Sequence, residues 1–157
     1  MKLHCHSPHL ATAFLSQQHI HTMKRTNISS GAPWENLVGY SRAVCIGNMI
    51  EVAGTTAVVD NEVHCKGDAA GQTRLILEKI KAAIEEAGAS MRDVIRTRIF
   101  TTDISRWEEI GKVHGEYFRD IKPATTMVEV RKLIDPEMLV EIEASAVMMG
   151  QMNWDQL

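Results

Sequence analysis

The stretch PATTMVEVRKLIDPEMLVEIEASAVM, from Pro123 to Met148, decides the fold of this chain because it holds two strand-forming runs and the turn between them. Thr125 to Leu133 and Leu139 to Met148 are rich in the β-branched residues that favour extended backbone. Ile134-Asp135-Pro136-Glu137 separates the runs with residues typical of a turn. The C-terminal third therefore predicts two strands of a sheet.

The first half of the chain predicts a hairpin followed by a helix. Tyr40 to Ile46 and Met49 to Thr56 read as strands around a Gly47-Asn48 turn, and Asp60-Asn61 marks another turn. From Asp68, a plausible N-cap, the spacing of apolar residues becomes helical until Gly88 stops the helix. The apolar positions of this helix are Leu75, Ile76, Ile80, Ala83, Ile84 and Ala87.

A further strand and a second helix follow. Met91 to Asp103 alternates, with one face formed by Val94, Arg96, Arg98 and Phe100, and the other by Ile95, Thr97 and Ile99. Ser105 and Glu108 have the spacing of a capping box. The second helix then has an apolar stripe of Trp107, Ile110, Val113, His114, Tyr117 and Phe118. At the edge of that stripe, His114 is expected to be a packed core or interface residue rather than a catalytic one.

The order strand, strand, helix, strand, helix, strand, strand predicts an α+β fold, a two-layer sandwich with both helices on one face of a mixed sheet. We expect 1–30 to be a flexible extension, 31–149 the domain and 150–157 a tail. The face without helices is predicted to be partly apolar, from Val128, Val130, Val140 and Ile142. An uncovered apolar face predicts self-association.

Composition narrows the functional classes. The 157 residues are 45% hydrophobic and 24% charged, which fits one domain, and the net charge of −3 without a basic stripe argues against nucleic acid. No apolar run approaches the length of a membrane span. Cys5, Cys45 and Cys65 are an odd number without CxxC spacing, so a reducing, cytoplasmic setting is expected, with Cys45 as a small buried hydrophobe. His4, Cys5, His6 and His9 offer metal-binding side chains, but such a tail seldom forms a closed site, and no metal is predicted.

Several segments resemble the RidA (YjgF) family of reactive-intermediate deaminases. The similarity extends from about Trp34 to Met148 and is most specific in the C-terminal signature. The matching segments are Gly39–Ser41, Ile46–Ile50, Ala53–Thr55, Asp68–Thr73, Ala87–Val94, Thr102–Asp103, Pro123–Val130, Leu133 and Val140–Ala144.

The resemblance implies a chorismate mutase-like fold and a homotrimer with a barrel-like core. Three clefts between subunits would then hydrolyse small enamines or imines without a metal or organic cofactor. In such clefts a glutamate, here Glu141, activates the attacking water. Tyr40, Gly54, Thr55, Thr125 and Met127 are the implied ligand-binding residues.

The chain departs from the family pattern where the deaminases carry an arginine that holds the substrate carboxylate. Thr125 stands at that position, Met127 occupies a position that is often cysteine, and Gly111 falls on or near a common asparagine. A bidentate guanidinium contact to a carboxylate contributes about 1.5–3 kcal/mol, whereas a threonine offers one neutral donor. Arg131 lies about 20 Å along an extended chain from Thr125. Arg42 and Arg98 belong to other strands, so the sequence does not place them.

Three functions stay open at this point. The first is a cofactor-independent hydrolase of an imine, enamine or related metabolite, with Glu141 as the catalytic residue. The second is a trimer that binds a small metabolite without catalysis. The third is an endoribonuclease, against which the acidic net charge argues.

Overall fold

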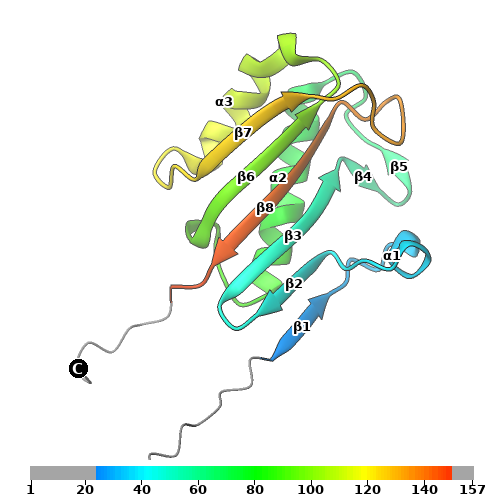
Figure 1. Ribbon diagram of the computed structural model, residues 1–157. Helices are drawn as coiled ribbons and strands as arrows, with labels where there is room; N and C mark the ends of the chain where they lie inside the picture. Colours follow the sequence, from blue (N-terminus) through cyan, green and yellow to red (C-terminus); the bar gives the residue numbers. More distant parts are fainter. Residues whose placement is uncertain (1–23, 150–157) are drawn as a thin grey trace, which may run out of the picture.

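The computed structural model describes residues 24–149, which form one mixed sheet backed by two long helices (Figure 1). The six strands lie in the order β1-β2-β3-β8-β6-β7. β6 and β7 are parallel, and every other neighbouring pair in this sheet is antiparallel. The predicted α+β fold, a two-layer mixed sheet with two main helices on one face, is confirmed.

Five strands of this sheet correspond to predicted runs, with ends that differ by up to several residues, and one strand, β1, was not predicted. The strands are β1 (Arg25–Ile28), β2 (Ala43–Ile46), β3 (Met49–Thr56), β6 (Val94–Thr101), β7 (Ala124–Glu129) and β8 (Val140–Val147). The small hairpin β4 (Val58–Val59) and β5 (Glu62–Val63) turns through Asp60 and Asn61, which have φ angles of 51° and 65°. The predicted turn at Gly47-Asn48 is confirmed because Ile46 pairs with Met49 across it.

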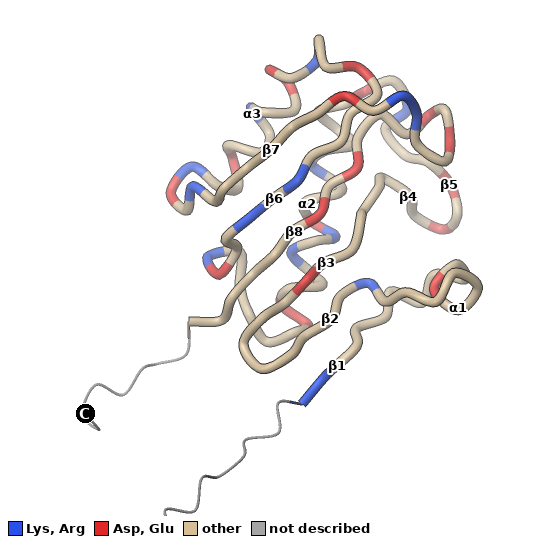
Figure 2. Tube along the Cα trace, in the orientation of Figure 1, with Lys and Arg blue, Asp and Glu red and all other residues tan. Residues whose placement is uncertain are grey.

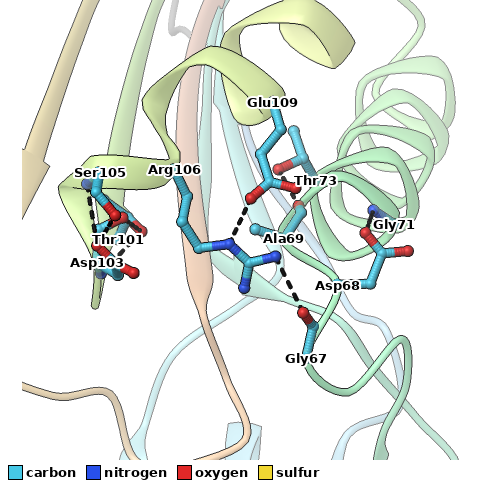
Figure 3. Close-up of polar contacts among 10 residues, drawn as sticks. All are labelled: Gly67, Asp68, Ala69, Gly71, Thr73, Thr101, Asp103, Ser105, Arg106 and Glu109. Atoms are coloured by element: carbon cyan, nitrogen blue, oxygen red, sulfur yellow. Dashed lines mark hydrogen bonds and ion pairs between the residues drawn. The ribbon is translucent and has the colours of Figure 1, made fainter.

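The helices are α1 (Pro33–Val38), α2 (Ala69–Glu86) and α3 (Trp107–Phe118). Asp68 caps α2 as predicted, because its carboxylate accepts a hydrogen bond from the amide of Gly71 at 2.9 Å (Figure 3). No helix among the described residues is both long and apolar enough to cross a membrane. The cluster His4, Cys5, His6 and His9 lies outside the described residues.

The core lies between α2, α3 and one face of the sheet. Ile50, Ile99, Val140 and Ile142 project from the strands onto the buried faces of the helices. The helical core residues are Ile76, Leu77, Ile80, Ile84, Ile110 and Val113. This packing fixes which residues of each strand face the helices and which face away, and that division positions the candidate site.

Three local predictions are wrong. First, β1 lies within 1–30, which was predicted to be a flexible extension, because its backbone pairs with the edge of β2. Second, the strand predicted from Met91 begins at Val94, since Ser90 and Asp93 close a capping box over the 3-10 helix η1 (Met91–Asp93). The irregular pairing between Val94 and Arg96 then turns Val94 to the core and leaves Ile95 exposed.

The third error is the capping box at Ser105 and Glu108. Asp103 is the cap instead, because its carboxylate accepts hydrogen bonds from the amide and the hydroxyl of Ser105 at 3.0 and 2.6 Å (Figure 3). The chain passes through the 3-10 helix η2 (Ile104–Arg106) before α3 begins at Trp107. With its hydroxyl bound to Asp103, Ser105 makes no capping contact with position 108.

The face of the sheet that no described helix covers, here called the open face, carries charged as well as apolar residues. Val128 lies on it as predicted, opposite Phe100 and 41% exposed. Val140 and Ile142 were predicted to lie on it, but both are fully buried on the helix side. The alternation of β8 instead turns Glu141 and Glu143 to the open face. Figure 2 shows acidic positions along β8 beside basic positions along β6. The apolar argument for self-association from these two residues therefore fails.

Candidate active site

Glu141 lies on the open face directly over Gly54. β8 pairs with β3 on one side, with Glu141 opposite Thr56, and the pairing shifts between Val52 and Thr55. This irregularity bends β3 at Ala53 and Gly54, as a bulge does. A Cβ atom added to Gly54 would collide with Oε1 of Glu141 and lie 3.0 Å from its Cδ. Only glycine therefore leaves room for the carboxylate in its present position.

The surroundings of Glu141 favour its protonated form. Burial raises the pKa of this carboxyl, and repulsion by Glu143 raises the pKa further, while the positive charge of Arg42 partly opposes both effects. A carboxyl of this kind exchanges a proton closer to neutral pH than an ordinary glutamate does. Glu141 is thus chemically suited to accept a proton from water or to return one to a leaving group.

Arg42 is the cation that acts on the Glu141 carboxyl, lowering its pKa, and it also binds the backbone of Gly54. Only 9% of its surface is exposed, and its Nη1 donates hydrogen bonds to the carbonyl of Gly54 at 3.0 Å and to Oγ1 of Thr55 at 2.9 Å. Its Nε is buried without a hydrogen-bond partner in the described part of the chain. Arg42 therefore holds the bend of β3 beneath the Glu141 carboxylate.

Thr55 does not offer its side chain to a ligand. It is fully buried, receives the hydrogen bond from Arg42, and donates one to the carbonyl of Ala53 at 2.8 Å. Its contribution within the chain is to support Arg42 and the bend of β3. Within one chain, the buried side chain of Thr55 therefore cannot make the predicted contact with a ligand.

Tyr40 follows α1 and lies beside Arg42, with the guanidinium carbon 5.8 Å from the centre of its ring. The ring also lines a shallow cavity of about 340 Å³ on the open face. Arg98 and Glu143 line the same cavity and form an ion pair, with 2.8 Å between Nε and Oε2. Because Arg98 is paired with Glu143, it is not free to replace the substrate-binding arginine that the resemblance implies at position 125.

Thr125 and Met127 lie on the opposite face of the sheet from Glu141. Thr125 pairs with Thr97 and Met127 with Ile99, and both partners belong to the buried, helix-facing side of β6. In addition, β7 is separated from β8 by β6. One chain therefore does not bring Thr125 and Met127 together with Glu141.

The predicted residues thus form two half-sites. The first contains Glu141, Gly54 and the neighbouring Tyr40, with Arg42 beneath them. The second contains Thr125 and Met127 at the exposed edge strand β7. β7 is the last strand in the order of this sheet, so the second half-site lies at the edge of the sheet and the first lies away from that edge.

Two residues of the second half-site were not expected from the sequence. Oγ1 of Thr97 lies 3.0 Å from Nε2 of His114 and 2.9 Å from Oγ1 of Thr125. His114 stacks on Phe118 with 4.5 Å between the ring centres, so the prediction of a packed residue captured only part of its surroundings. The signal that was available is Thr97 itself, a polar residue at a core position between Ile95 and Ile99.

The chain is thus an α+β domain with one helix-covered face, a carboxylate over a glycine bend, and a second polar group at an edge strand. Comparison with known proteins agrees with this fold class. The family model described as Endoribonuclease L-PSP matches residues 31–148. The chain belongs to this family, which is also called the YjgF or RidA family, so the resemblance seen in the sequence is confirmed.

Three relatives illustrate the match. A RutC family protein of Pyrococcus abyssi is 41% identical over 109 residues, which cover 68% of this chain and 84% of the relative. The crystal structure of Rv2704 from Mycobacterium tuberculosis, described as a member of the highly conserved YjgF/YER057c/UK114 family, is 53% identical with a TM-score of 0.73; the match covers 80% of this chain and all of that one. E. coli TdcF with bound serine is 29% identical with a TM-score of 0.65, covering 78% and 93% of the two chains.

Proposed function

We propose that this protein is a homotrimer that hydrolyses a small reactive imine or enamine in clefts between its subunits. The observation that carries the proposal is the division of the site, with Glu141 over Gly54 on one face and Thr125 on the other. A second copy that brings its β7 edge against the open face near Glu141 would complete the cleft. Each cleft would then contain Glu141 and Tyr40 of one subunit, and Thr125 and Met127 of its neighbour.

The proposed reaction uses Glu141 as the base. The substrate enters as the protonated imine, an iminium ion, and the oxygen of a water molecule attacks its carbon while the carboxylate of Glu141 accepts a proton from that water. The resulting carbon centre carries a hydroxyl and an amino group. Transfer of the proton to the amino nitrogen, breaking of the carbon–nitrogen bond and loss of the hydroxyl proton then give ammonia and a ketone, so that atoms and charge balance without an oxidant or a metal.

Two observations support a small, amino acid-derived ligand. The relative TdcF binds serine, which has the size of the imines that 2-amino acids generate. The cavity that Tyr40 lines on the open face is also shallow and has a volume of about 340 Å³, which fits a small molecule.

The alternative is a trimer that binds a metabolite without converting it. The specific observation in its favour is Thr125, which offers a neutral hydroxyl where the resemblance implies a guanidinium. Weaker hold on a substrate carboxylate reduces the stabilisation of the transition state by the same interaction. Binding without turnover is the result that this alternative predicts.

The decisive experiment generates 2-iminopropionate or 2-iminobutyrate in situ and follows loss of the imine. We expect hydrolysis faster than in buffer, and a Glu141→Gln variant should lose at least 100-fold of that rate, as expected for a general base. Glu85→Gln is the control, because Glu85 is exposed on α2, on the helix side of the sheet and away from the candidate site. Imine loss at the buffer rate by the wild-type protein would reject the deaminase proposal for these substrates.

Light scattering tests the assembly separately. A mass of three chains supports the proposed clefts, and a single chain at working concentration would remove them.

The family description also includes the word endoribonuclease, so RNA is incubated with the same preparation. We expect it to stay intact, and RNA cleavage that copurifies with the trimer would favour the ribonuclease alternative.

A further inference from the structure

The hydroxyl of Thr125 is the outer end of a chain of hydrogen bonds that begins in the core. Nε2 of His114 lies 3.0 Å from Oγ1 of Thr97, which lies 2.9 Å from Oγ1 of Thr125. Thr97 is fully buried, whereas Thr125 is exposed on β7. These three side chains, here called the Thr–His relay, therefore connect a half-buried imidazole with the surface of the second half-site.

The direction of this chain follows from counting hydrogens. Thr125 donates its single hydroxyl hydrogen to the carbonyl of Pro123 at 3.2 Å, because a carbonyl only accepts. Oγ1 of Thr125 must then accept the hydrogen of Thr97. With that hydrogen used, Thr97 must accept from His114, so Nε2 carries a hydrogen.

We propose that His114 acts through Thr97 as a positioning residue that fixes Thr125 as a hydrogen-bond donor toward the ligand. This inference rests on the proposed function and names the ligand group: an oxygen or nitrogen acceptor, such as a carboxylate or carbonyl oxygen or an imine nitrogen. On binding, that acceptor replaces the carbonyl of Pro123. A ligand that presents an N–H or O–H group uses only the second lone pair of Oγ1 and leaves the carbonyl of Pro123 in place, so it gains nothing from the direction that the relay imposes.

The surroundings of His114 keep its ring neutral and restrain its orientation. Burial lowers the pKa of the imidazole, so at neutral pH the ring is uncharged and has only one N–H group. The stack on Phe118, one helical turn along α3, restrains the plane of the ring. A neutral chain of three aligned donors polarises each hydroxyl in turn and strengthens the last one as a donor. The relay thus supplies a directed, uncharged donor at the position of the missing guanidinium.

The first test determines which ring nitrogen of His114 carries the hydrogen. It uses nitrogen NMR of the isotope-labelled full-length protein at a pH where His114 is neutral. The His114→Gln variant identifies the signals of His114, because they are missing from its spectrum. We expect the hydrogen on Nε2, exchanging slowly with solvent. In Thr97→Val, which keeps the shape of the side chain and removes its hydroxyl, that protection should be lost. Thr101→Val is the control, since Thr101 is also buried on the helix side of β6 but binds Asp103. A bare Nε2 with the hydrogen on Nδ1 would overturn the relay.

The second test measures binding of 2-oxobutyrate, a small acceptor ligand. Loss of one neutral hydrogen bond predicts a dissociation constant about three- to tenfold higher in Thr97→Val, with no such change in Thr101→Val. His114→Gln, whose amide can donate in place of Nε2, should restore most of the affinity lost in His114→Leu. Equal affinities in wild type and Thr97→Val would reject the role of the relay in binding. If no keto acid binds, that result counts against the proposed function. The NMR measurement of which nitrogen of His114 carries the hydrogen still tests the relay independently.

Discussion

The carboxylate of Glu141 lies so close to the α-carbon of Gly54 that a methyl group at position 54 would occupy the space of Oε1. These residues come from neighbouring strands, β8 and β3, where the pairing between them is irregular. A bend in the backbone of one strand therefore sets the position of a side chain on the next. This contact leads to the first of four predictions.

Gly54→Ala should displace the Glu141 carboxylate and reduce imine hydrolysis by roughly tenfold or more, because a misplaced catalytic group loses its favourable geometry. The measurement is the imine-loss assay with the variant beside wild type. Gly115→Ala serves as the control, since a Cβ atom at Gly115 meets no neighbour within 4 Å and the change should only stabilise α3, by up to about 1 kcal/mol. A Gly54→Ala enzyme with wild-type activity would show that the close contact is dispensable.

Glu141→Gln should stabilise the protein at neutral pH and have little effect in acid. Burial and Glu143 raise the pKa of Glu141 in the folded state, so its ionisation costs folding free energy. That cost is absent below the ordinary value of 4.5 and reaches its full size once the pH exceeds the raised pKa. Melting temperatures of both proteins across this range test the sign. A variant that is less stable than wild type at neutral pH would contradict the prediction.

Arg42→Met should move the acidic limb of the activity profile to higher pH. Arg42 lowers the pKa of Glu141, so its removal raises that pKa further and a higher pH is needed to form the carboxylate. The variant also leaves the carbonyl of Gly54 and the hydroxyl of Thr55 without their buried donor, at a cost of about 2 kcal/mol of stability. The pH dependence of kcat/KM and urea unfolding measure the two effects. An unshifted acidic limb would show that Arg42 is only structural.

Thr125→Arg should increase imine hydrolysis about 10- to 100-fold, because a guanidinium contact to the substrate carboxylate contributes about 1.5–3 kcal/mol. The side chain at 125 is exposed, so the longer arginine needs no repacking of the core. Thr126→Arg adds the same charge one residue along, on the opposite face beside Arg98, and should bring no gain. Equal effects of the two substitutions would indicate a general charge effect rather than a clamp.

Local patterns predicted most of the secondary structure correctly. The hairpin turn at Gly47-Asn48, the cap at Asp68 and the alternation of β8 each depend on residues close together in sequence. The errors occurred where a competing local contact won, as at Ser105, whose hydroxyl binds Asp103. β1 was missed because four residues with little apolar content become a strand only by pairing with β2.

The candidate site was predicted only in part. The resemblance of the C-terminal signature pointed to Glu141 and Thr125, but no periodicity relates residues on different strands. Arg42 shows this limit, because the sequence offered three arginines and only the folded chain places one of them beneath Gly54. His114 likewise looked like an ordinary member of an apolar stripe until Thr97 was found beside it.

The sequence by itself determined the order of the two long helices and of the strands β2, β3, β6, β7 and β8, the family and the absence of a guanidinium at position 125, because backbone preferences and side-chain identity act locally. Only the tertiary structure decided that Glu141 and Thr125 face opposite sides of the sheet, and that the Thr125 hydroxyl is tied to a buried histidine. Both facts depend on register between strands far apart in the chain. A shift of one residue in a strand would exchange its two faces, and packing of the core against α2 and α3 is what fixes that choice.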